Sequence, residues 1–147
     1  MKKKSTILKL SLLSGAIYFF LVSAAHLSGL KIPGLYIYFD IPSYPYQDNI
    51  VAFLTLGWSI FFYTAFTDVV KNIALVKAIL IAGAAAIIVL SIINIKTDFQ
   101  LLNNNVDINI IWLEIFILFV YWLWLVVFYF RLKKNLDQNE DFNNDFT

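Results

Sequence analysis

Four long apolar runs, separated by short polar segments, account for most of this 147-residue chain. A helix needs about 20 mostly apolar residues to cross a hydrocarbon core of roughly 30 Å. Lipid offers the backbone no hydrogen-bond partners, so each run must pair its own amides and carbonyls, which favours helices over strands. The pattern predicts an all-α fold, an integral membrane four-helix bundle within residues 1–134. The helices are expected at about residues 7–30, 49–66, 72–95 and 107–132.

The composition agrees with a lipid environment. Apolar residues make up 61% of the chain and charged residues only 14%, whereas charged residues are about 25% of a typical soluble domain. The basic residues form short runs beside apolar helices and no broad basic surface, so we expect no nucleic-acid partner. The main expected partner is the lipid bilayer.

The basic residues indicate an orientation. Nine of the eleven lie before the first run, around the turn between the second and third runs, or after the fourth, and only Lys31 and Lys96 lie at the opposite end. The positive-inside rule therefore predicts that both termini are cytoplasmic. Residues 135–147 are acidic and polar, and we predict a disordered cytoplasmic tail there.

The first run also resembles a signal peptide, because it follows three lysines and reaches a small-residue stretch at residues 22–25. Its apolar part exceeds the usual length of about 7–15 residues for such a peptide. We therefore expect a retained membrane helix.

The segment from His26 to Trp58 holds the only histidine, all three prolines and four of the eight tyrosines. Pro33 and Gly34 are expected to break the first helix, and residues 35–41 suit either an extended strand or a segment lying flat on the membrane. Asp48 is placed to cap the second helix. We predict an ordered outer loop that covers the bundle.

Small residues predict where helices pack, since they let two backbones approach closely in lipid. Gly15 and Gly29 each follow a small residue by four positions in the first run. In the aromatic second run, Gly57 is the one position where we expect another helix to approach closely. The third run carries an alanine every four residues, which predicts a packing seam at Ala74, Ala78, Ala82 and Ala86.

Two ionisable residues lie where lipid would make them costly, His26 in the first helix and Glu114 in the fourth. At 1.5 Å per residue both would lie roughly 6 to 10 Å below the outer surface. An intramembrane ionisable group suggests a functional site with a named partner, and we predict that Glu114 accepts a hydrogen bond from His26. The alternative is a purely structural role, in which the two side chains satisfy each other's hydrogen-bonding groups and set the helix register without binding a ligand. A ligand site here would also draw on Tyr121, Asn94, Tyr44 and Asp48.

Several kinds of chemistry are disfavoured. The chain has no cysteine and one histidine, which leaves no usual zinc ligand set. Its five glycines are isolated and no serine has a GxSxG context, so phosphate loops and that nucleophile motif are missing. We expect no metal, no cofactor and no enzyme activity.

The His26 to Trp58 segment, taken with the four-helix layout and the chain length, resembles the BphX-like family of small bacterial membrane proteins. The resemblance implies a multi-pass protein of the bacterial inner (plasma) membrane and an accessory role beside aromatic-degradation functions. It carries over no catalytic residue.

Two functions follow as hypotheses. The first is an accessory or interaction protein without catalysis, either a subunit of a larger membrane assembly or a homo-oligomer, which uses its aromatic fourth helix and its outer loop. The alternative is a binder or transporter of a lipid or small molecule that uses His26 and Glu114 beneath the tyrosine-rich loop.

Overall fold

The computed structural model describes residues 2–144, with side chains described for residues 6–138. In this part of the chain every regular element is helical, and each of the four long helices is long and apolar enough to cross a membrane. The predicted all-α, four-helix layout is confirmed. The elements are α1 (Lys2–Ser28), α2 (Pro45–Thr67), α3 (Ile73–Lys96), the short 3₁₀ helix η1 (Phe99–Leu101) and α4 (Ile108–Asn144).

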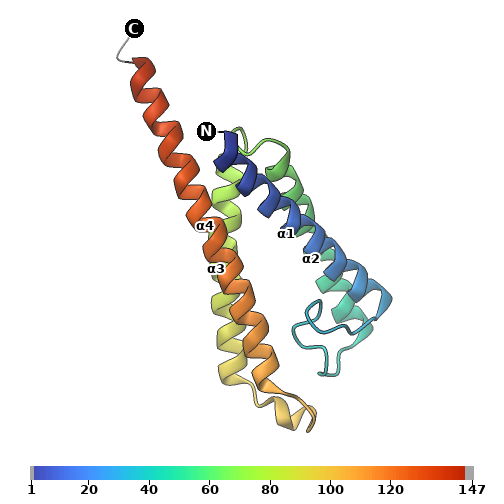
Figure 1. Cartoon of the computed structure of the whole chain (residues 1–147). Helices are drawn as coiled ribbons and strands as arrows, with labels where there is room; N and C mark the ends of the chain where they lie inside the picture. Colours follow the sequence, from blue (N-terminus) through green and yellow to red (C-terminus); the bar gives the residue numbers. More distant parts are fainter. Residues whose placement is uncertain (1, 145–147) are drawn as a thin grey trace.

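The helices form two antiparallel pairs, α1 with α2 and α3 with α4 (Figure 1). One end of the molecule carries both termini and the α2–α3 turn, and we call it the terminal end. The other end, the loop end, carries residues 29–44 and 97–107. The pairs cross near the terminal end and lean apart towards the loop end (Figure 1).

Serine hydroxyls join α1 to α2. Ser23 Oγ donates to the Ala52 carbonyl at 2.9 Å, and Ser59 Oγ donates to the Ala16 carbonyl at 2.8 Å. Both bonds are buried. Since lipid gives apolar helices no hydrophobic reason to associate, such bonds and close packing hold them together.

Gly15 marks the point where α1, α2 and α4 meet. A Cβ at Gly15 would lie 2.5 Å from the Phe62 ring and 2.5 Å from the Tyr121 hydroxyl. That hydroxyl donates to the Ser11 carbonyl at 2.6 Å, and Trp124 Nε1 donates to Ser11 Oγ at 2.9 Å. The absence of a side chain at Gly15 therefore allows the two helix pairs to cross.

The α3–α4 contact corrects the predicted alanine seam. Trp122 Nε1 donates to the Leu80 carbonyl at 2.8 Å, and a Cβ at Gly83 would lie 3.0 Å from Trp122 Cδ1. The buried residues of α3 are Val76, Ile79, Leu80 and Asn94, whereas three of the four predicted alanines are exposed and the other is half-buried. Large side chains and Gly83 decide which face turns inward. The four alanines of the predicted seam are Ala74, Ala78, Ala82 and Ala86.

Two other glycines also do not pack as predicted. Gly29 has a φ of +68° just after the end of α1, and neither Gly29 nor Gly57 has an atom within 4 Å of where a Cβ would lie. A glycine with positive φ commonly ends a helix because it lacks the Cβ that this conformation strains. Gly29 therefore ends α1, and Gly57 faces open space.

The predicted disordered tail is wrong for residues 135–144, because α4 continues to Asn144. No proline or glycine follows Gly83 in the chain, so nothing breaks a helix that the membrane segment has already nucleated. Residues 145–147 of that prediction lie outside the described residues.

Candidate functional site: a cavity beneath the loop

A cavity of about 630 Å³ lies between the two helix pairs, in the half of the molecule nearer the loop end. Its walls come from all four long helices, and residues 35–43 of the loop form its roof. Along α2 the lining runs from Gln47 to Phe62, a span of roughly 22 Å at 1.5 Å per residue. The space is therefore long and narrow.

The cavity walls are mostly aromatic and aliphatic. Phe62, Tyr121 and Leu125 lie at the deep end, and Trp58 and Trp122 line the sides. A pocket of this kind, apolar with a few polar groups at one place, is the usual form of a small-molecule site. Among the described lining residues, the histidine and the carboxylate, His26 and Asp48, both lie at the loop end.

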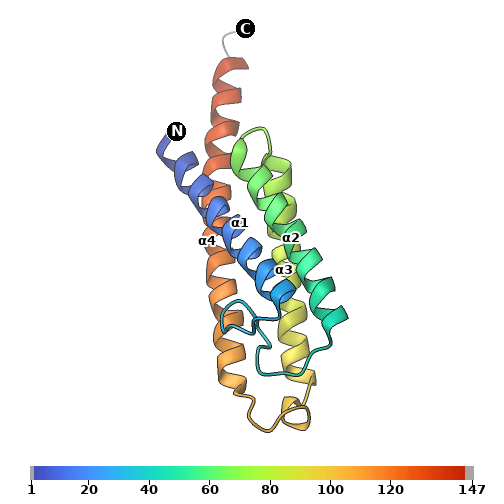
Figure 2. The same ribbon diagram turned by 90° about the vertical axis from the view of Figure 1, so that its right-hand side faces the viewer.

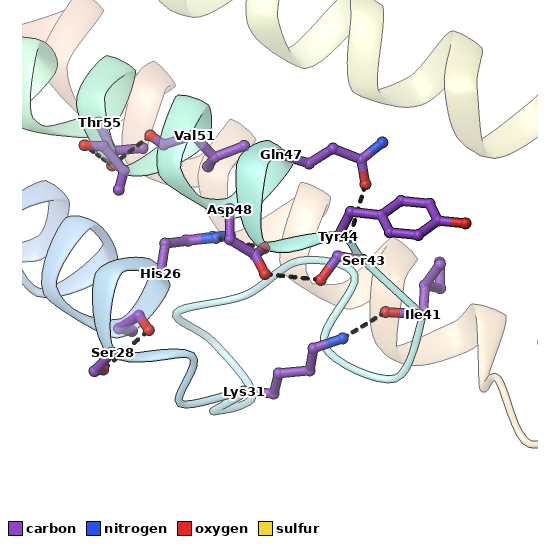
Figure 3. A network of polar contacts seen from close by, with 12 residues as sticks. His26, Ser28, Lys31, Ile41, Ser43, Tyr44, Gln47, Asp48, Val51 and Thr55 are labelled. Carbon is purple, nitrogen blue, oxygen red and sulfur yellow. Dashed lines mark hydrogen bonds and ion pairs between the residues drawn. The ribbon is translucent and has the colours of Figure 1, made fainter.

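His26 and Asp48 form the polar centre of the site (Figure 3). His26 Nδ1 lies 3.3 Å from Asp48 Oδ1, and Ser43 Oγ donates to Asp48 Oδ2 at 3.0 Å. The His26 ring stacks on Tyr36, with 3.5 Å between the centroids. The side chain of His26 is only 9% exposed, so its ring is held on two sides.

Local structure explains why these two residues meet. His26 belongs to the last turn of α1 and Asp48 to the first turn of α2. An anion is favoured at a helix N-terminus, so the Asp48 carboxylate suits the start of α2. Asp48 is not the helix cap that we predicted. Pro45 takes the first helical position, Tyr44 is the capping residue, and Gln47 Oε1 accepts from the Tyr44 amide at 3.1 Å.

The predicted hydrogen bond between His26 and Glu114 does not form. Glu114 Oε1 instead accepts from the backbone amide of Gly34 at 2.8 Å, and the Tyr18 hydroxyl donates to the Gly34 carbonyl at 3.0 Å. The helix pairs have separated at this depth, and the loop fills the space between α1 and α4 (Figure 2). Gly34, with a φ of +83°, is thereby held from both sides. Glu114 fixes the roof of the cavity rather than binding His26.

Further contacts close the roof. Lys31 Nζ donates to the Ile41 carbonyl at 2.8 Å, within the loop (Figure 3). Asp40 joins the two loops, since its carbonyl accepts from Asn103 Nδ2 at 2.6 Å and its Oδ2 accepts from the Asp107 amide at 3.3 Å. The roof is tied to the α3–α4 connection as well as to α1 and α4.

The other predicted site residues are dispersed. Tyr121, on α4, lies at the deep end of the cavity, where its hydroxyl donates to the Ser11 carbonyl and not to His26 or Asp48. Asn94 is 7% exposed, and its amide atoms have no hydrogen-bond partner among the described residues. Tyr44 is 68% exposed and stacks on Tyr46 outside the cavity. Of the predicted set, only His26 and Asp48 come together.

Burial also acts on the tyrosines of the roof. Desolvation, together with the neighbouring Asp48 carboxylate, raises the pKa of Tyr36 well above its usual value of 10.0. Desolvation alone raises the pKa of Tyr38. Tyr36 is only 3% exposed, so its ring is part of the packed roof.

The exposed lining residues show where the cavity opens. Those of the helices are Gln47 and Val51 on α2 and Ala86 and Ile93 on α3, whereas the lining residues of α1 and α4 are all buried or half-buried. Apart from the bond at the turn from Asn72 to the Thr64 carbonyl, no hydrogen bond joins α2 to α3 in the described part of the chain. The mouth lies between α2 and α3, on a surface that would face lipid.

Sequence reasoning missed the aromatic walls and the partner of His26. One signal was available, because Val51, Thr55, Trp58 and Phe62 repeat at spacings of four, three and four, which places them on one face of α2. Among the described residues, no group of three or more histidine, aspartate or glutamate side chains is placed to hold a metal ion.

A scan of family models, a search of curated proteins and a search of solved structures found no match to this chain. The resemblance to the BphX-like family stays a hypothesis.

Proposed function

We propose that this protein is a multi-pass membrane protein that binds a lipid or a hydrophobic small molecule in the cavity between its helix pairs. The cavity carries the proposal, because its volume of about 630 Å³ falls within the range of about 300–1,000 Å³ found for small-ligand pockets. Its mouth between α2 and α3 admits molecules dissolved in the bilayer. We place the protein in a bacterial inner membrane, with the loop end facing away from the cytoplasm, from the charge distribution and the family resemblance. No covalent chemistry belongs to the proposal.

A hydrophobic photolabel tests whether the cavity takes up molecules from the bilayer. The protein is reconstituted in lipid vesicles with a trifluoromethyl phenyl diazirine, irradiated and mapped by mass spectrometry. Phe20 and Leu21 on α1 are exposed and should be labelled through ordinary lipid contact. Phe19 and Val22 on the same helix line the cavity, so their labelling reports entry. We expect all four to be labelled, and only the inward pair to be saturable.

A matched pair of substitutions locates the entrance. Ala86→Trp places an indole at the mouth, whereas Ala85→Trp places it on an exposed position of α3 outside the cavity. We expect Ala86→Trp to suppress the inward labelling and Ala85→Trp to leave it unchanged. Inward residues that remain unlabelled in the unmodified protein would refute the proposal.

A second candidate function is that of an interaction protein, a subunit of a larger membrane assembly. The C-terminal end of α4 supports this candidate. Leu136 still packs on the core, but the last turns of α4 project beyond the other helices at the terminal end (Figure 1). A projecting helix is available to a partner subunit. Deleting residues 139–147 should abolish a specific cross-linked product in native membranes while the inward photolabelling persists. An unchanged cross-linking pattern would count against this candidate.

A further inference from the structure

Resting on the proposed function, we infer that the occupant of the cavity is an uncharged amphiphile with one hydrocarbon chain or ring system and a hydroxyl head that hydrogen-bonds to His26. The inference names the class of ligand for this same site. It stands on the hydrogen-bonding groups, the charges and the shape of the cavity.

The head group is indicated by the free edge of the His26 ring. Nδ1 faces Asp48, which leaves Nε2 as the other hydrogen-bonding atom of a ring that lines the cavity. Nε2 makes no hydrogen bond to any residue that the structure describes. Nε2 accepts a hydrogen bond when the imidazole is neutral and donates one when it is protonated. A hydroxyl does both, so it matches the ring in either state.

The charges in the cavity exclude an anionic head. Among the residues whose side chains the structure describes, no lysine or arginine lines the cavity, and the Asp48 carboxylate lies beside His26. The nearest lysine in the loop, Lys31, directs its Nζ to the Ile41 carbonyl. A phosphate or carboxylate would therefore enter a site whose described lining holds a negative neighbour and no cation, and burying an unpaired charge is costly. A cationic head is also disfavoured. It would lose its hydration and find only the Asp48 carboxylate, which already accepts hydrogen bonds from His26 and Ser43.

The shape of the cavity suits a single chain. The space extends along α2 for roughly 22 Å, from Gln47 to Phe62, and its volume of 630 Å³ leaves only a narrow cross-section over that length. An amphiphile placed with its hydroxyl at His26 would extend its apolar part towards Phe62 and Leu125. The hydroxyl would then lie at the depth where α1 ends, close to the expected membrane surface, as it does for such a molecule dissolved in a bilayer.

Competition between three probes of equal chain length tests the inference. Dodecanol, dodecane and dodecanoate are each titrated against the diazirine labelling of Phe19 and Val22, with every concentration expressed as the measured mole fraction in the bilayer. We expect dodecanol to suppress the labelling at a concentration about tenfold lower than dodecane or dodecanoate, which corresponds to about 1.4 kcal/mol. His26→Phe keeps a ring to stack on Tyr36 but removes the acceptor, and should abolish the advantage of dodecanol over dodecane. Tyr44→Phe, which removes a hydroxyl outside the cavity, should leave the advantage intact.

The outcomes separate the two proposals. If Phe19 and Val22 are never labelled, the cavity takes up nothing and the proposed function fails. If they are labelled but the three probes compete equally, or dodecanoate competes best, the function stands and the ligand class is wrong. If dodecanol keeps its advantage in His26→Phe, the hydroxyl is bound elsewhere and the inference is likewise overturned. Should His26→Phe fail to fold, the comparison of the three probes on the unmodified protein still decides the ligand class.

Discussion

The substitution Gly15→Ala should destabilise the bundle, although alanine is the better helix former. The new Cβ would lie 2.5 Å from both the Phe62 ring and the Tyr121 hydroxyl. Overpacking of this kind costs about 1–3 kcal/mol, and moving Tyr121 weakens its bond to the Ser11 carbonyl, worth about 0.6 kcal/mol in a membrane protein. Helix propensity returns about 1 kcal/mol. We expect a net loss of about 0.6–2.6 kcal/mol in the free energy of unfolding.

Gly57→Ala is the matched control, because it makes the same change in a neighbouring membrane helix. No atom lies within 4 Å of where its Cβ would be, so only the propensity term remains and stability should rise by up to about 1 kcal/mol. Both variants are unfolded by titrating sodium dodecyl sulfate into mixed micelles, with helical circular dichroism as the signal. The reasoning is refuted if Gly15→Ala is as stable as the unmodified protein, or if the two variants shift in the same direction.

Three further predictions concern the loop and the helix pairs. Glu114→Ala removes the acceptor of the Gly34 amide and should speed amide hydrogen exchange across residues 29–44. Glu114→Gln keeps an acceptor oxygen and should leave the exchange rate unchanged. Equal exchange rates in the two variants would refute the role of Glu114. Ser59→Ala removes the buried bond to the Ala16 carbonyl and should lower stability by about 0.6 kcal/mol in the same micelle titration; no loss would show that this bond is not needed. The neutral form of Tyr36 is favoured in the folded protein, so its contribution to stability is present below pH 10 and should be lost as the pH rises beyond about 10. In Tyr36→Phe that alkaline loss should be smaller, and an identical pH profile would contradict it.

The number and type of the elements could be predicted from the sequence. Each apolar run is long enough to cross a membrane, and a backbone in lipid has to form its hydrogen bonds within the run. The sequence therefore predicts that each run is a helix. The short polar stretch around Asp68 also left room only for a tight turn. There, Asp68 Oδ1 accepts from the Lys71 amide at 3.2 Å, and this bond holds the pKa of Asp68 below its usual range.

The inward faces of the helices could not be predicted in the same way. In a soluble protein an apolar stripe identifies the buried side of a helix, but a membrane helix is apolar all round. The alanine stripe of α3 therefore predicts the wrong face, because the structure buries Val76, Ile79 and Leu80 and brings α4 close at Gly83. The polar composition of residues 135–144 predicts disorder, but no proline or glycine interrupts this segment, and α4 continues to Asn144.

The sequence by itself determined that the chain forms four helices able to cross a membrane, and that its few intramembrane ionisable groups lie near one end. Only the tertiary structure decided which of them meet. Glu114 has the right depth to reach His26, but the helix pairs lean apart there and the loop passes between them. Glu114 therefore accepts a hydrogen bond from the Gly34 amide, and His26 pairs with Asp48. The same separation creates the cavity, whose size depends on the angle between two helix pairs, a quantity that no local pattern of residues encodes.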